Sequence, residues 1–208
     1  MQIIHTIFLT SHNRGYLIKE AIKSISSLYK FQCLILDNGS NKETLEIIKT
    51  AIKNKKQFSL IEFPEKKCLA PYAAMIEESK HLAQGEWIHY LCDDDLFGKK
   101  RLNFNYGKGD AYYFRLIYFG DENKINQSFR FPGNIFNIGS QILYNLDHNQ
   151  VTHRRGFLEK CIWNKDAQWA DGEFFNQIAK FTEIHPINII GVYKRMHKNS
   201  ITYKYLTK

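Results

Sequence analysis

The sequence of 208 residues contains only four cysteines, and no two of them form a C-x-x-C pair. They are far apart and lie in or beside apolar runs, where a free thiol behaves as a small hydrophobic group: Cys33, Cys68, Cys92 and Cys161. Cysteine usage of this kind predicts a reducing, cytoplasmic location.

Long hydrophobic runs are also missing. The longest uncharged stretch, residues 131–146, is interrupted by Pro132, Gly133 and Gly139, so it cannot span a bilayer. The N-terminus has no basic leader and no small-residue cleavage site, which predicts a first strand and not a signal peptide. Because internal repeats and linkers rich in Pro, Ser or Gly are absent too, we expect one domain.

The chain does have a globular composition with a surplus of positive charge. Hydrophobic residues make up 44% and charged residues 24%, and the net charge is +8. From Lys194 onward there are five Lys or Arg residues and no acid. The surplus indicates an anionic partner, which composition leaves open among nucleic acid, a membrane surface, a phosphorylated metabolite and an anionic polymer.

The first half alternates apolar runs with amphipathic segments. We predict strands at 5–10, 31–36, 58–63 and 86–91, and helices at 14–28, 42–53 and 70–84. The first helix would place Leu17, Ala21, Ile25 and Leu28 on one face. This alternation predicts an α/β fold with a mostly parallel sheet and helices on both faces.

The second half is less regular. We predict strands at 110–119 and 187–195, short helices at 154–160 and 171–181, and a mixture of loop and strand at 133–150.

Polar clusters follow three of the predicted strands, at residues 10–14, 37–40 and 92–97. Because ligands bind at the carboxyl ends of parallel strands, we expect these clusters to share one crevice. The acidic run 93–95 has three ordinary explanations: a turn with helix-capping acids, a hard-cation site, or a general acid/base pair. Oxygen ligands favour Mg²⁺ or Mn²⁺, which proteins usually hold with one or two carboxylates plus substrate phosphates.

Five segments, in order, resemble the successive motifs of the family 2 glycosyltransferases of GT-A fold: TIFLTSHNRGYLIKEAIKSI, CLILDNGSNKETLEII, GEWIHYLCDDDLF, WADGEFFNQIA and VYKRMHKNSIT. The resemblance implies one Rossmann-like GT-A domain over residues 1–208. Residues 1–97 would be its nucleotide-sugar-binding half, and residues 98–208 its acceptor side with a short irregular C-terminal region. It implies an enzyme that transfers a sugar from a nucleotide diphosphate, usually UDP, to an acceptor hydroxyl with inversion.

The resemblance also implies residues for the nucleotide. Thr10 and Arg14 would border it, and Asp37 would accept a hydrogen bond from the N3–H of uracil. A carboxylate accepts but cannot donate, which fits a base edge that presents an N–H. The residues leave one alternative open, in which Asp37 is a turn acid that caps the next helix.

Two registers of the acidic motif are compatible with the family pattern. In one, Asp93 and Asp95 form the D-x-D pair, with one near the ribose and the other on the metal. In the other, Cys92 replaces the first acid of an Asp-x-Asp-Asp motif, and Asp94 and Asp95 are the pair. Asp95 belongs to both registers and is therefore the predicted ligand of Mn²⁺ or Mg²⁺.

The C-terminal motif contributes cations. His197 matches a position that contacts the metal or the pyrophosphate in parts of the family, and its alternative is an exposed side chain. Arg195 and the adjacent Lys194 would neutralise the leaving diphosphate, where negative charge builds up during transfer.

The resemblance implies that Asp171 is the catalytic base. The reaction needs a base because the acceptor hydroxyl must lose its proton as it attacks. Glu173 competes for this role, and both acids are also typical of a helix start. Trp169 could stack on a sugar face. The segment 146–155 resembles an acceptor-side segment, so Asp147 and His148 would touch the donor or the acceptor sugar.

The acceptor stays open. The commonest family assignment is a glycan intermediate, which can be lipid-linked and anionic, and a nucleic acid base is the rival suggested by the positive charge. Basic clusters at 99–101 and 153–155 would flank the crevice.

The donor sugar also stays open. Residues 65–78 lack the Asn-Gly and Ala-Arg-Asn motifs that many family members carry before the fourth strand. Nucleotidyl transfer to a sugar phosphate uses a similar sheet and acidic site, but it usually begins with a Gly-rich loop after the first strand, and residues 10–15 are not such a loop. A non-catalytic nucleic-acid-binding protein would not need the acidic run.

Overall fold

A computed structural model of the chain describes residues 2–120 and 146–198. The strands are β1 (His5–Ser11), β2 (Phe31–Asn38), β3 (Phe58–Phe63), β4 (Trp87–Cys92), β5 (Leu96–Phe97), β6 (Ala111–Gly120), β7 (Val151–Arg154) and β8 (Ile184–Met196). The helices are α1 (Gly15–Ser24), α2 (Lys42–Ile52), α3 (Pro71–Ser79), α4 (Phe157–Lys160) and α5 (Ala170–Ala179), with short 3-10 helices at Lys80–Leu82 (η1) and His148–Gln150 (η4).

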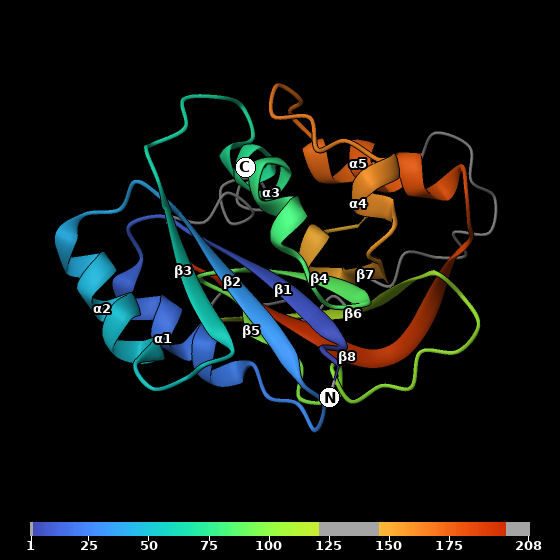
Figure 1. The fold of residues 1–208 in the computed structure, drawn as a ribbon, viewed down its shortest axis with the longest axis horizontal. Coiled ribbons are helices and arrows are strands. Elements are labelled where there is room, and N and C mark those ends of the chain that lie inside the picture. Colours follow the sequence, from blue (N-terminus) through green and yellow to red (C-terminus); the bar gives the residue numbers. More distant parts are fainter. Residues whose placement is uncertain (1, 121–145, 199–208) are drawn as a thin grey trace.

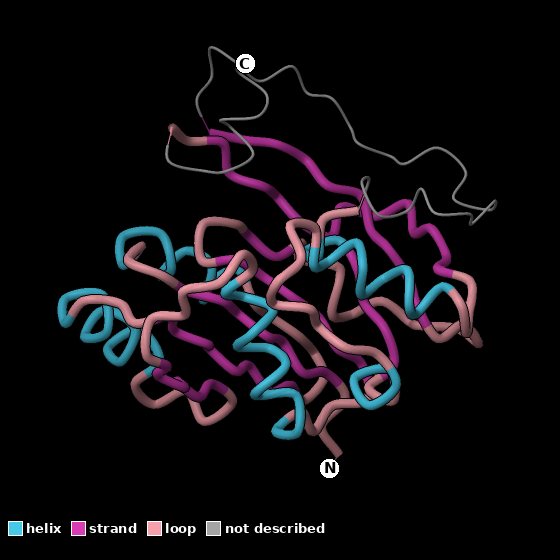
Figure 2. The backbone as a smooth tube through the Cα atoms, turned by 90° about the horizontal axis from the view of Figure 1, so that it is seen from above, coloured by secondary structure: helices cyan, strands magenta, loops and turns pink. Residues whose placement is uncertain are grey.

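The strands form one sheet in the order β3-β2-β1-β4-β7-β6-β8-β5, which runs through the molecule as a twisted layer (Figures 1 and 2). The strands β1 to β4 are parallel, as predicted. β7 is antiparallel to β4 and to β6, β6 is parallel to β8, and β5 is antiparallel to β8. The predicted α/β fold with a mostly parallel sheet is confirmed.

Helices cover both faces of the sheet because the parallel strands are apolar on both sides. Ile7 and Leu9 of β1 pack in one core with residues of α1 and α2. Phe8, between them, points to the opposite face and packs in a second core with residues of α3 and α5. The period of two residues along a strand produces this division.

The first helix ends earlier than predicted. α1 stops at Ser24, and Leu28, expected on its buried face, is 88% exposed. Ser24 donates its hydroxyl to the carbonyl of Ala21 at 2.6 Å and accepts the backbone N–H of Phe97 at 2.8 Å. Serine side chains compete in this way with the helical backbone, and the segment after Ser24 is rich in serine.

The two short strands β5 and β7 were not predicted, and both matter for the position of the site. β5 follows the acidic run directly and pairs with β8, with Leu96 opposite Tyr193. This pairing brings the end of β8 beside the end of β4, although about a hundred residues separate them in the chain. Of the predicted loop-and-strand mixture, residues 133–145 lie outside the described residues, and 146–150 contain η4.

The carboxyl ends of the parallel strands meet at one edge of the sheet. Thr10 of β1 lies opposite Leu36 of β2 and Cys92 of β4, and Ser11 lies opposite Asp37. The loops after these strands therefore open on the same side. Across the described ranges, no helix has the length and apolarity to cross a bilayer.

We expect Phe174→Ala to lower the free energy of unfolding by about 3–5 kcal/mol, because it removes a fully buried ring from the core. This ring stacks on Trp163, with centroids 4.3 Å apart. Phe181→Ala is the matched control: its ring is 59% exposed, and we expect a loss below about 1 kcal/mol. Urea unfolding measures both, and equal losses would contradict this assignment of the core.

Candidate active site

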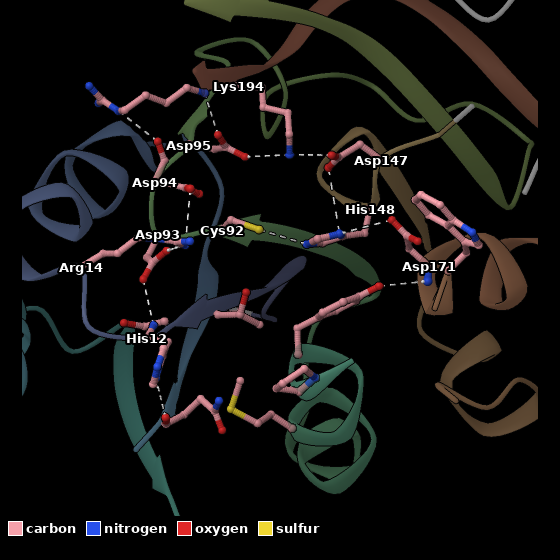
Figure 3. A pocket seen from close by; sticks show the side chains of 18 of the residues that line it. His12, Arg14, Cys92, Asp93, Asp94, Asp95, Asp147, His148, Asp171 and Lys194 are labelled. Atoms are coloured by element: carbon pink, nitrogen blue, oxygen red, sulfur yellow. Dashed lines mark hydrogen bonds and ion pairs between the residues drawn. The ribbon is translucent and has the colours of Figure 1, made fainter. Parts of the chain in front are cut away.

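Side chains from several parts of the chain line a cavity of about 350 Å³ at this edge of the sheet (Figure 3). They come from the ends of β1, β4 and β8, from η4, and from the first turns of α3 and α5. Of the predicted site residues, Thr10, Arg14, Asp93, Asp94, Asp95, Asp171 and Arg195 line it. The polar clusters at 10–14 and 92–97 thus share one crevice.

Asp93 is bound by neighbouring protein groups. The Arg14 guanidinium donates to its Oδ1 at 2.8 Å, and the His12 backbone N–H donates to its Oδ2 at 2.9 Å. Burial raises the pKa of Asp93 to about 6, and the positive charge of Arg14 opposes that shift. Both oxygens therefore hold the loop after β1 against the end of β4.

Asp94 points into the cavity from the next position (Figure 3). Its Oδ2 lies 3.1 Å from Nε2 of His197 and 3.4 Å from Nη1 of Arg14. Its backbone carbonyl accepts the Nε–H of Arg195 at 3.1 Å. His197, the predicted metal or pyrophosphate contact, is thus one hydrogen bond from the acidic run.

Asp95 is almost completely buried and receives mostly neutral donors. The Arg195 backbone N–H donates to its Oδ1 at 2.8 Å, and the Asn149 amide donates to its Oδ2 at 2.6 Å. The Lys194 ammonium is 3.5 Å away. Burial raises the pKa of Asp95 to about 7; Lys194 opposes this shift, and two neighbouring carboxylates add to it.

Lys194 is paired more closely with Asp147, at 2.6 Å. Burial would raise the pKa of Asp147, but Lys194 and His148 outweigh it and lower this pKa to about 2. Asp147 also caps η4, because it accepts the Asn149 backbone N–H at 3.0 Å. The ion pair therefore joins the end of β8 to the segment that carries His148 and Asn149.

His148 lies between Cys92 and Asp171. Its Nε2 is 3.2 Å from Cys92 Sγ and its Nδ1 is 3.6 Å from Asp171 Oδ2. Its ring stacks on Tyr72 of α3, whose hydroxyl oxygen accepts the Asp171 backbone N–H at 3.2 Å. Burial would lower the pKa of His148, but Cys92 and Asp171 outweigh it and raise this pKa well above its usual value.

Asp37 is buried and does not line the cavity, whereas its neighbour Asn38 does. Ser40 donates to both of its oxygens, through the backbone N–H at 2.8 Å and the hydroxyl at 2.5 Å. The cap of α2 is Asn41, not Asp37. The contact between Asp37 and uracil stays a prediction.

The structure divides the basic clusters: Lys99, Lys100 and Arg155 are exposed, and the other three residues have partners within the protein. Arg101 is fully buried and donates to the carbonyls of Asn149 and Val151. His153 is also fully buried, bonded to Tyr90 at 2.7 Å. Arg154 forms ion pairs with Glu86 and Asp110. We correct the expectation for these three residues: Arg101 and His153 lie inside the protein, and the charge of Arg154 is paired with two acids at the surface.

Sequence reasoning missed Tyr72 and Asn149, and it did not foresee the contact between Cys92 and His148. Tyr72 belongs to the stretch that departs from the family pattern, so no motif pointed to it. Asn149 directly follows Asp147 and His148, and a polar triplet between apolar residues was the available signal.

The residues fit a divalent cation. Five carboxylates and three Lys or Arg side chains line the cavity. Arg14 and Lys194 lie closest to Asp93 and Asp147, which leaves Asp94 and Asp95 the less neutralised pair. One donor atom each from Cys92, Asp94 and Asp95 lies within 4.8 Å of the others. A cation there would neutralise the buried Asp95 carboxylate, and phosphate oxygens can complete such a site.

A family model for glycosyl transferase family 2 matches residues 6–164. The chain belongs to this family. Among curated proteins, this family 2 chain is similar to Protein CgeD of Bacillus subtilis (strain 168), at 26% identity over 223 residues that cover 97% of the chain and 52% of CgeD. The chain thus spans about half the length of this curated relative.

The solved structures confirm the predicted GT-A fold of the family 2 chain. TarS 1–349 of S. aureus matches with a TM-score of 0.73 and 15% identity, over 93% of this chain and 60% of that one. A complex of the same protein with UDP-GlcNAc matches with a TM-score of 0.69. The mannosyltransferase PcManGT from Pyrobaculum calidifontis, in complex with GDP-Man and Mn²⁺, matches with a TM-score of 0.68 and 14% identity, over 96% and 59%.

We expect the stability of the cation-free Asp95→Asn variant, relative to that of the parent, to increase with pH. Because burial raises the pKa of Asp95 to about 7, against about 3.9 when unfolded, its contribution to stability is full below about pH 3.9 and is lost as the pH rises to about 7. An uncharged amide avoids this loss. The free energy of unfolding of the variant relative to the parent should rise by about 1–3 kcal/mol between about pH 5 and about pH 8.

Urea unfolding in EDTA at the two pH values measures this difference. Asp166→Asn is the control, because the Asp166 side chain is 66% exposed and should show no such gain. A difference for Asp95→Asn that does not change with pH would contradict the account of its burial.

Proposed function

We propose that this chain is a metal-dependent, inverting glycosyltransferase domain that transfers a sugar from a UDP-sugar to an acceptor hydroxyl. One observation carries the proposal. A single cavity holds two incompletely neutralised carboxylates, Asp94 and Asp95, at one side and a separate carboxylate, Asp171, at the other. Sugar transfer from a nucleotide diphosphate needs both: a place for a cation and a diphosphate, and a base for the acceptor.

The donor side would use the ends of β1, β4 and β8. Thr10 and Arg14 border the nucleotide in this proposal, and Asp94 and Asp95 hold Mn²⁺ or Mg²⁺, with His197 beside them. Asp93 is the acid of this run that a guanidinium neutralises most closely, through Arg14 at 2.8 Å, so we assign the functional pair to the register with Asp94. The UDP-GlcNAc bound to TarS, a protein of the same fold, supports a UDP-sugar as the donor.

Lys194 and Arg195 would act on the leaving diphosphate. Both belong to β8 and already lie against Asp95, through the ammonium at 3.5 Å and the backbone N–H at 2.8 Å. A bound divalent cation would supply additional positive charge where negative charge develops on the leaving group. Fixed cations in a cavity of this kind stabilise that charge without having to reorganise.

Asp171 would take the proton of the acceptor hydroxyl as that oxygen attacks the anomeric carbon. One of its oxygens accepts the Gly172 backbone N–H at 2.9 Å, and the other faces His148. These contacts fix the carboxylate at the start of α5, which is the acceptor side in this proposal. Because attack and departure take place on opposite faces of the sugar, a single displacement inverts the anomeric centre.

For the acceptor we propose a glycan or polysaccharide intermediate and a cytoplasmic enzyme. A nucleic acid base is the second candidate, favoured by the net charge of +8. The buried positions of Arg101 and His153 weaken it. The division into a nucleotide-sugar half at 1–97 and an acceptor half at 98–208 also stays a proposal, although Lys194 and Arg195 of the second half would serve the donor.

The donor site is tested by calorimetric titration of UDP with Mn²⁺ and with EDTA. We expect binding that depends on the cation and weakens about tenfold or more in Asp95→Asn, which removes a ligand charge. Asp166→Asn is the control. Asp166 is exposed and pairs with Lys165, so this variant should bind UDP as the parent does. UDP affinity that is equal with Mn²⁺ and with EDTA would contradict metal dependence, and absence of binding would contradict a UDP donor.

We expect Asp171→Asn to lower sugar transfer by about 10²–10⁴-fold while UDP affinity stays close to that of the parent, because the base acts on the acceptor and not on the donor. Glu173→Gln is the matched control. Glu173 accepts the Asn164 amide at 3.0 Å, and its loss should have a small effect on turnover. Sugar transfer or donor hydrolysis, measured with a panel of UDP-sugars, compares the two variants. A larger loss of turnover in Glu173→Gln than in Asp171→Asn would assign the role of base to Glu173.

A further inference from the structure

Cys92 occupies an unusual place in the donor site. It is the last residue of β4 and lines the cavity, and it is only partly buried. Its Sγ and one carboxylate oxygen each of Asp94 and Asp95 lie within 4.8 Å of one another. Two oxygens and one sulfur thus converge on the place where the proposed function requires a cation.

We infer that Cys92 is a thiolate ligand of the divalent cation in this site, so that the site prefers softer ions such as Zn²⁺ and Co²⁺ to Mg²⁺. This inference rests on the proposed function, which requires a cation there. Carboxylates alone suit Mg²⁺ and Mn²⁺, whereas thiolates select softer metals. The thiol proton passes to solvent as the metal–sulfur bond forms.

The surroundings of Cys92 support this role. Nε2 of His148 lies 3.2 Å from the sulfur, and a hydrogen bond from it would orient the sulfur and stabilise its negative charge. His148 is itself fixed by its stack on Tyr72 and by Asp171. The other cysteines are not placed for the role, because Cys33 and Cys161 are buried in the two cores and Cys68 does not line the cavity.

Cobalt provides a direct test, because a thiolate bound to Co²⁺ gives a charge-transfer absorption band in the near ultraviolet and carboxylates do not. The reduced full chain is titrated with Co²⁺ in the presence of UDP, and calorimetry follows binding in the same samples. We expect the band in the parent and in Cys68→Ser, the matched control for a partly buried cysteine. We expect no band in Cys92→Ser or Cys92→Asp.

Competition with Mg²⁺ tests the selectivity. Mutation of a group that only orients a metal ligand lowers metal affinity by about 10–100-fold. The sulfur of Cys92 would be a direct ligand that favours Co²⁺ over Mg²⁺, so its loss should lower this preference by at least about tenfold. Cys92→Asp restores an all-oxygen site, and its Mg²⁺ affinity should equal or exceed that of the parent.

The outcomes separate this inference from the proposed function. Cobalt binding without a band, or a band that persists in Cys92→Ser, would overturn the role of Cys92 and leave the metal-dependent transferase intact. An unchanged preference for Co²⁺ over Mg²⁺ in Cys92→Asp would also overturn it. No cation binding under any condition would overturn the inference and the metal dependence together.

Discussion

Like charges crowded at a buried strand end are the constraint on which this site depends. Asp93, Asp94 and Asp95 follow β4 directly, and burial raises the pKa of Asp93 and of Asp95. Each carboxylate needs positive partners or good donors, which no single strand can supply. Arg14, in the loop after β1, pairs with Asp93, and Lys194 of β8 lies near Asp95. The elements that meet at this edge are therefore joined through the acids that they neutralise.

The second half of the chain completes the neutralisation. The pairing of β5 with β8 places the Arg195 backbone N–H on Asp95, and the Asp147–Lys194 pair fixes η4 beside it. The same short helix presents Asn149 to Asp95 and His148 to Asp171. One set of contacts thus sets the distance between the proposed donor site and the proposed base. Catalysis by positioning requires this kind of rigid connection.

The parallel half of the sheet could be predicted from local sequence patterns. Apolar runs such as 31–36, and the polar residues that follow them, can be recognised within a few adjacent residues. The early end of α1 and the short strand β5 could not be predicted, since the hydrogen bond between Ser24 and Phe97 forms between distant segments. Motifs singled out Asp95 and Asp171, and both line the cavity. They could not show that Arg101 and His153 are buried or that Cys92 meets His148, because these facts depend on tertiary packing.

The central claim is that Asp94 and Asp95 hold the cation and Asp93 does not. A crystal of the protein grown with Mn²⁺ and UDP and measured for anomalous scattering tests it most directly. We predict one strong anomalous peak within bonding distance of the Asp94 and Asp95 carboxylates and of the UDP phosphates, with Asp93 still bound to Arg14. A peak on Asp93, or ordered UDP with no peak near these residues, would contradict the account.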